Sequence, residues 1–121
     1  GWFERTKATM PEGMVVAQTV EEKAFYRPWT YARPFVSRFV AVDQAAMRTH
    51  PDQPDKRIVD LVFYGRWSRT AKVPVLFDCA AFKRADIVDG IEFGENGEVV
   101  GAAWIDLTRT DPVLEAACAK V

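Results

Sequence analysis

Alternating apolar and polar side chains predict β-structure in the middle of the chain. Across residues 56–64, one set of alternate positions is entirely apolar (Val59, Leu61 and Phe63), whereas the other set includes Asp60. Successive side chains of a strand point to opposite faces of a sheet, so this period predicts a strand with one fully apolar face. That face belongs against a hydrophobic core.

Further strand-like runs recur along the chain and are rich in valine and aromatic residues, which pack well on a pleated surface. The predicted strands cover residues 14–18, 35–42, 73–79, 82–88, 91–93 and 99–105. The last two flank Asn96 and Gly97, the residue pair that a type I′ turn requires. We therefore expect these two strands to form a hairpin with Asn96 and Gly97 at its tip.

Three segments depart from this pattern. Residues 43–48 predict one helical turn, and residues 50–55 predict a surface loop because two prolines and two aspartates lie among them. Prolines and a glycine interrupt the beginning of the chain, at Pro11, Gly13, Pro28 and Pro34. We expect residues 1–34 to form an irregular N-terminal segment, with at most the short strand at 14–18.

The end of the chain carries the signals of a helix. Asp111 is a favoured N-cap residue and Pro112 suits the first helical position. Lys120 lies where a cation stabilises the end of a helix. Leu114 and Cys118 follow at helical spacing and share one face, which we expect to contact the sheet.

A chain of 121 residues is long enough to bury the core of one domain. We predict a single α+β domain, in which an antiparallel β-sheet with a C-terminal helix packed on it occupies residues 35–121. The net charge of −1 and the pI near 5.9 lack the positive field of general nucleic-acid-binding proteins, so we expect no nucleic-acid partner. No apolar run approaches the roughly 20 residues of a membrane-spanning helix, so no transmembrane segment is expected.

Cys79 and Cys118 are the two cysteines of the chain. Cys79 ends a predicted strand and Cys118 lies on the sheet-facing side of the predicted helix, so a disulfide between them is the favoured interpretation. Disulfides persist outside the cytosol and are rare within it, which indicates an exported protein of the periplasm or cell surface. Two buried, reduced thiols in a cytosolic protein are the alternative. A beginning at Gly1 rather than Met fits a processed mature chain, although a degraded terminus would look the same.

Basic and aromatic residues gather without any acid in residues 23–39. The residues best suited to bind a partner are Arg27, Trp29, Tyr31 and Arg33 in this segment and Trp67 in a second acid-free patch. Arginine and aromatic side chains are enriched at binding hot spots because they bury a large area with few rotatable bonds. The alternative is that the aromatic rings fill the core and the arginines surround it.

Residues that carry catalytic chemistry are scarce. The one histidine, His50, lies in the proline-rich predicted loop, so we do not expect a Ser-His-Asp triad. One histidine and two paired cysteines cannot fill a zinc site, and no glycine-rich phosphate loop is present. We expect no metal, no cofactor and no catalytic residue. Scattered carboxylates, such as Asp60 and Asp78, leave an acid/base hydrolase as the third functional hypothesis.

Several stretches of residues 38–118 follow one another in a distinctive order. They are residues 38–47, residues 57–64, Phe77-Asp-Cys79, residues 97–100 with Trp104, and residues 114–118. This order resembles the surface-adhesin protein E family of Gram-negative bacteria. The resemblance implies a small extracytoplasmic α+β binding domain without catalysis. Residues 1–34 have no counterpart in it, and no cysteine at the start of the chain supports the lipoprotein anchor of part of that family.

These observations favour a non-catalytic, adhesin-like binding domain that docks a protein or another macromolecule through the arginine and aromatic residues. A small accessory or structural subunit of a larger cell-envelope or membrane complex is the alternative, in which the same residues would lie along a partner protein. Stoichiometric co-purification with one partner separates these two hypotheses.

Overall fold

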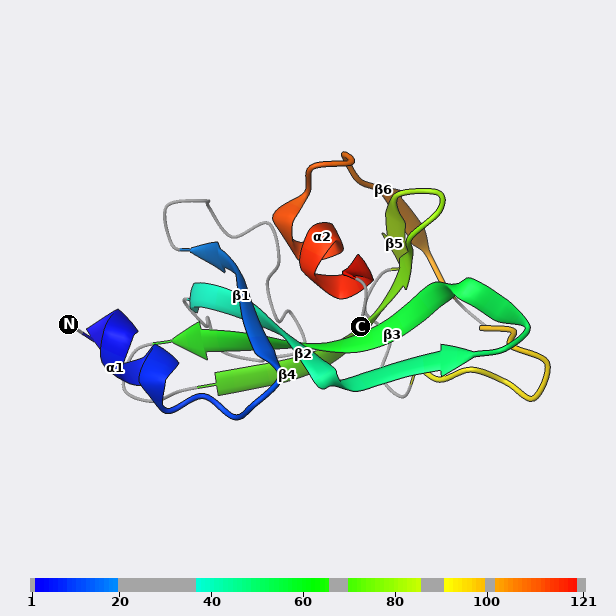
Figure 1. The fold of residues 1–121 in the computed structure, drawn as a ribbon. Helices are drawn as coiled ribbons and strands as arrows, with labels where there is room; N and C mark the ends of the chain where they lie inside the picture. The colour runs from blue at the N-terminus through cyan, green and yellow to red at the C-terminus, as the bar shows by residue number, and fades with distance from the viewer. Residues whose placement is uncertain (1, 20–36, 66–69, 86–90, 100–101, 120–121) are drawn as a thin grey trace.

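The computed structural model describes residues 2–19, 37–65, 70–85, 91–99 and 102–119. Within these residues, the strands form one six-stranded antiparallel sheet in which each strand pairs with the next along the chain (Figure 1). The strands are β1 (Met14–Thr19), β2 (Ser37–His50), β3 (Gln53–Gly65), β4 (Thr70–Asp78), β5 (Lys83–Ala85) and β6 (Trp104–Asp106), and the helices are α1 (Trp2–Ala8) and α2 (Pro112–Cys118). The predicted fold, an α+β domain with a C-terminal helix packed on an antiparallel sheet, is confirmed.

Strand β3 lies inside the sheet and shows the alternation that the sequence predicts. Val59, Leu61 and Phe63 are fully buried and form one hydrophobic cluster with alternate residues of β2 and β4. Helix α2 covers this cluster and adds Val113 and Leu114 to it (Figure 1). The apolar face of β3 is therefore the face on which the helix packs.

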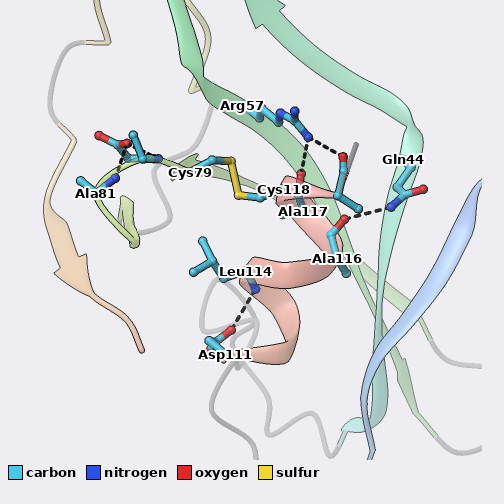
Figure 2. The surroundings of a disulfide bond; sticks show 12 residues. Gln44, Arg57, Cys79, Ala81, Asp111, Leu114, Ala116, Ala117 and Cys118 are labelled. Atoms are coloured by element: carbon cyan, nitrogen blue, oxygen red, sulfur yellow. Dashed lines mark hydrogen bonds between the residues drawn. A yellow bond between two sulfur atoms is a disulfide. The ribbon is translucent and has the colours of Figure 1, made fainter. Parts of the chain in front are cut away.

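Helix α2 begins as the sequence predicts. The carboxylate of its N-cap, Asp111, accepts hydrogen bonds from the N–H groups of Val113 (3.0 Å) and Leu114 (2.9 Å), the latter drawn in Figure 2. Asp111 is buried, so these bonds replace water for the carboxylate and for the first turn of the helix. A helix of 7 residues is too short to be stable alone in water, so α2 depends on its packing against the sheet.

The opposite face of the sheet carries a smaller cluster. Ile58, Leu76 and Ala85 are buried there together with Ile91. Ile91 belongs to residues 91–99, which are not part of a helix or strand. This irregular segment takes the place on the second face that α2 takes on the first.

A stacked pair of rings lies on this second face, toward the start of β2. The ring centroids of Phe39 and Tyr64 are 4.7 Å apart and their planes are nearly parallel. Burial, and to a smaller extent the negative charge of Asp43, raises the pKa of Tyr64 above its ordinary value. The phenol therefore holds its proton more firmly than an exposed tyrosine does.

Two predicted interruptions of the sheet are wrong. Residues 43–48 do not form a helical turn, because β2 continues through them to His50. The loop predicted for residues 50–55 is reduced to a turn at Pro51 and Asp52, after which β3 begins. Pairing with β3 outweighs the weak local preference of these residues, and proline is tolerated at the first positions of a strand.

The turn predicted at Asn96 and Gly97 is present but of a different type. The N–H of Gly97 donates to the carbonyl of Gly94 at 3.0 Å, so Glu95 and Asn96 are the central residues. Gly97 follows them with a φ of +81°, whereas Asn96 lacks the positive φ that a type I′ turn demands. Glycine is needed here at the residue after the turn, where the chain enters the left-handed region.

Within the described residues, the hairpin arms predicted on either side of this turn form no ladder with each other, although the N–H of Gly94 donates to the carbonyl of Glu98 at 2.7 Å. Residues 91–93 form no strand, because Ile91 is buried against the second face of the sheet instead of extending its edge. Of the second predicted arm, residues 99–105, the described part contributes Trp104 and Ile105 to β6, and β6 pairs with β5. The predicted strand at 82–88 is β5 within the described residues.

The beginning of the chain is more ordered than the sequence predicts. Strand β1 confirms the short strand expected at 14–18, whereas α1 occupies a part of the chain that was expected to be irregular. The remainder of the predicted irregular segment, residues 20–34, lies outside the described residues.

Candidate functional site

A bulge in β2 shapes the most distinctive surface of the described residues. Asp43 pairs with Asp60 and the next paired residue of β2, Arg48, lies opposite Ile58. Residues 44–47 therefore stand opposite Val59 alone. Such insertions bend a strand and redirect its side chains, and they occur often beside functional sites.

Local hydrogen bonds hold the bulge in place. The carboxylate of Asp43 accepts from the N–H of Ala45 at 3.1 Å. The guanidinium of Arg48 donates to the carbonyl of Ala46 at 3.1 Å and lies 3.6 Å from the carboxylate of Asp60. These contacts satisfy backbone groups that the interrupted ladder leaves without a cross-strand partner.

The bulge opens a groove along the half of the β2–β3 hairpin that is nearest its tip. Its volume is about 610 Å³, and it is open to solvent along one side. The residues that line it are Gln44, Met47, Thr49, His50, Pro51, Pro54 and Arg57. Met47 and the two prolines give the groove an apolar surface, and the other four residues give it a polar one.

Two polar residues of this lining hold the C-terminal end of α2. The side-chain amide of Gln44 donates to the carbonyl of Ala116 at 2.9 Å. The guanidinium of Arg57 donates to the carbonyls of Ala117 (3.3 Å) and Ala119 (2.7 Å), as Figure 2 shows. The last carbonyls of a helix have no intrahelical partner and carry partial negative charge, so a cation is stabilising there.

A disulfide fixes the same end of the helix. Cys79 directly follows β4, Cys118 is the last residue of α2, and their Cα atoms are 5.6 Å apart (Figure 2). The predicted pairing is confirmed. The turn that carries Cys79 is itself held, because the carboxylate of Asp78 accepts from the N–H groups of Ala80 and Ala81 at 3.1 and 3.0 Å. The disulfide thus fixes to the sheet the same helix end that Gln44 and Arg57 of the groove hold.

His50 fixes the other end of the groove, at the tip of the hairpin. The N–H of Asp52 donates to Nδ1 of His50 at 3.1 Å, so Nδ1 acts as the acceptor. The proton of a neutral ring is then on Nε2, which donates to the carbonyl of Glu95 at 2.8 Å. His50 therefore ties the hairpin tip to the turn at 94–97 and is not a free base.

The turn approaches the hairpin tip so closely that it leaves no room for a side chain at Gly97. A Cβ atom added there would lie 2.7 Å from Cγ of Gln53 and 2.9 Å from Nδ1 of His50. Backbone approaches of this kind require glycine for steric reasons, in addition to the positive φ at this residue. The contact makes the hairpin tip and the second face of the sheet one packed unit.

The groove offers contacts for binding more readily than groups for reaction. Gln44, Arg57 and His50 already use donors on backbone carbonyls, and Asp and Glu are absent from the lining within the described residues. Across the described ranges, no group of three or more His, Cys, Asp or Glu side chains is placed to hold a metal ion. The surface that remains is that of Met47, Thr49, Pro51 and Pro54.

The partner-binding residues predicted from the sequence are Arg27, Trp29, Tyr31, Arg33 and Trp67, and all of them lie outside the described residues. Their role stays a prediction. The groove residues were missed because the sequence pattern assigned 43–48 to a helical turn and 50–55 to a loop. The presence of Pro51 and Pro54 beside His50 was a signal for a special surface, but nothing local indicated the bulge that brings Met47 to it.

Comparisons with known proteins do not assign the chain to a family. No protein-family model, no curated protein and no solved structure matches the chain. The resemblance to the surface-adhesin protein E family therefore stays an expectation from the sequence. Among the helices of the described residues, none is long and apolar enough to cross a membrane.

Proposed function

We propose that this protein is an extracytoplasmic binding domain, adhesin-like in its role, that docks an extended segment of a protein partner. The observation that carries the proposal is the groove at the β2 bulge, where the lining residues Gln44 and Arg57 also hold the helix end that Cys79–Cys118 bonds to the sheet. The disulfide supports a place in the periplasm or at the cell surface, because oxidising compartments preserve such bonds.

The groove suits an extended peptide because it lies along an open edge of the sheet. Strand β1 pairs with β2 only as far as Met14 opposite Asp43, and Gly13 accepts one further hydrogen bond from the N–H of Gln44 at 3.0 Å. From Ala45 onward, no strand within the described residues covers the outer side of β2. Peptide segments bind to such edges through backbone hydrogen bonds, and neighbouring pockets select their side chains.

The apolar lining indicates which side chains the segment carries. Met47 is flexible and fits varied apolar shapes, whereas Pro51 and Pro54 are rigid and cost no conformational freedom on binding. Arg57 contributes positive charge beside them while it holds α2. We expect a segment with at least one large apolar side chain and no excess of positive charge.

Within this proposal the arginine and aromatic residues extend the docking surface. Arg27, Trp29, Tyr31, Arg33 and Trp67 would contact the partner beyond the groove. If the partner is a permanent one, the protein is an accessory subunit of an envelope complex and co-purifies with that partner in fixed stoichiometry. No observation on the described residues favours the hydrolase, which needs paired carboxylates in a pocket.

Peptides selected from a random display library on the wild-type domain provide the probe for a direct test. We expect Met47→Glu to weaken their binding about ten-fold or more in fluorescence anisotropy, because the charge enters the apolar lining. Met47→Leu conserves volume and should retain binding, and Val15→Glu adds the same charge on an exposed residue of β1 as a control. Melting temperatures exclude unfolding as the cause.

Two further variants separate the groove from the arginine and aromatic surface. Trp29→Ala and Arg33→Ala should each weaken binding of the longer selected peptides and leave the melting temperature nearly intact. Some peptides could bind Met47→Glu as tightly as wild type but lose affinity for Trp29→Ala. That result would show that the binding site lies outside the groove. Wild-type binding by all three of Met47→Glu, Trp29→Ala and Arg33→Ala would contradict the proposed docking surface as a whole.

A further inference from the structure

The last strand of the sheet leaves apolar side chains in solvent. All three residues of β6 are exposed, and two of them, Trp104 and Ile105, are among the most exposed large apolar residues of the described chain, each with 37% of its surface accessible. Within the described residues, strand β6 pairs with β5 on one side and is the final strand of the sheet. An edge with exposed apolar residues is a template for pairing with another strand.

The hydrogen-bond pattern shows which backbone groups of β6 point away from the sheet. The N–H of Leu107 donates to the carbonyl of Phe82 at 2.8 Å. These two residues continue the register in which Arg84 lies opposite Ile105. Hydrogen-bonded and non-hydrogen-bonded pairs alternate in an antiparallel ladder, so Ile105 also bonds to β5. The N–H and C=O groups of Trp104 and Asp106 must then point outward.

We propose that this edge pairs with the same edge of a second copy of the chain, antiparallel, with the twofold axis at Ile105. In that register Trp104 and Asp106 of one copy exchange backbone hydrogen bonds with Asp106 and Trp104 of the other. Ile105 then faces Ile105 of the second copy in a non-hydrogen-bonded pair, where the Cα atoms approach to about 4.5 Å. Each outward N–H and C=O group of Trp104 and Asp106 then has a hydrogen-bond partner in the second copy.

The side chains of the edge complement themselves in the same register. Trp104 and Asp106 lie on one face of the sheet, and Lys83 stands beside both, opposite Asp106 in register and with its Nζ 4.9 Å from the Trp104 ring centroid. Pairing places Trp104 of each copy beside Asp106 of the other, and it brings the two tryptophans into a diagonal contact of roughly 7–8 Å. This self-complementarity favours a second copy over an unrelated strand.

The interface is small, since β6 contains 3 residues. We therefore expect a dimer that dissociates on dilution and not a permanent one. The inference uses the opposite edge of the sheet from the peptide groove, so either can hold without the other.

Charge-swapped variants at the axis residue test the proposal. In sedimentation equilibrium, the mass of the wild-type protein should rise with concentration from 13.7 kDa toward twice that value. Ile105→Lys and Ile105→Glu should each stay monomeric, because like charges meet at the axis. An equimolar mixture of the two should recover association, and Val15→Lys, exposed on β1, should associate as wild type does.

A cysteine at the same position gives an independent readout that needs no stable dimer. Under mild oxidation, Ile105→Cys should form a covalent dimer, since the axis pair lies within disulfide range, whereas Val15→Cys should not. A monomeric wild type at the highest soluble concentration, combined with no covalent dimer of Ile105→Cys, would overturn the proposal. Association of both charged variants, or failure of their mixture to associate, would overturn the twofold pairing at Ile105.

Discussion

The two faces of the sheet are covered in different ways. On one face, α2 buries Val113, Leu114 and Ala117 in a large cluster that extends across β2, β3 and β4. A disulfide and the hydrogen bonds from Gln44 and Arg57 hold the end of this helix. On the other face, residues 91–99 cover a cluster of few side chains and form no helix or strand.

Besides the apolar contacts of Ile91, polar and partly exposed contacts hold the second cover. Arg48 Nε lies 3.1 Å from the Glu92 carboxylate, whose side chain is 59% exposed, and His50 donates to the carbonyl of Glu95. Exposed ion pairs contribute about 0–1 kcal/mol each. We infer that the two faces differ in rigidity, because the covalent bond lies on the face that carries the groove, whereas noncovalent contacts close the second face.

Removal of the disulfide should have the largest effect on stability, because it abolishes the covalent constraint that distinguishes the first face from the second. The bond joins residues separated by 39 positions, and the loss of that constraint on the unfolded chain corresponds to about 4 kcal/mol in the chain-entropy model. We expect Cys79→Ser with Cys118→Ser to lose that much free energy of unfolding in urea titrations. A loss below about 1 kcal/mol would show that packing alone holds α2.

A matched pair of leucine truncations compares the two faces directly. Leu61 and Leu76 are both fully buried, the first under α2 and the second under residues 91–99. We expect Leu61→Ala to cost about 4 kcal/mol and Leu76→Ala about 3 kcal/mol, because the less constrained cover can collapse further into the cavity. Equal costs in denaturant titrations, or a larger cost for Leu76→Ala, would contradict the proposed difference in rigidity.

A substitution in the turn tests the smallest of these effects, at the second face. Gly97→Val should cost about 1–3 kcal/mol, since valine is strained at a φ of +81° and its Cβ would collide with the hairpin tip. Asn96→Ala is the control and should be nearly neutral in thermal melts, because Asn96 has no positive φ to maintain. A large loss for Asn96→Ala would indicate the type I′ turn that the sequence predicted.

The predictable parts of the fold are those that local chemistry determines. The apolar face of β3 follows from the alternation of Val59, Leu61 and Phe63, and the start of α2 follows from Asp111 and Pro112. The disulfide follows from the presence of two cysteines at the ends of two elements that pack together. Each of these features depends on residue types and spacing that are readable within a few positions.

The groove could not be predicted, because it depends on register between distant residues. The bulge at 44–47 exists only relative to Val59 on the neighbouring strand, and the partnership of β6 with β5 depends on how residues 91–99 cross the sheet. Local propensity carries no information on such pairings. For this reason the segment 43–48 was assigned to a helical turn and the edge at Ile105 to the arm of a different hairpin.

Alkylation of the protein before and after reduction is the most direct test of the central claim, that Cys79–Cys118 covalently fixes the helix end held by the groove residues Gln44 and Arg57. Unfolded, non-reduced protein treated with iodoacetamide should keep its intact mass, and reduction should then allow both cysteines to be modified. Proteolysis without reduction should yield one cross-linked pair of peptides containing Cys79 and Cys118. Modification of both cysteines without prior reduction would contradict the claim, and with it the proposal of an exported binding domain.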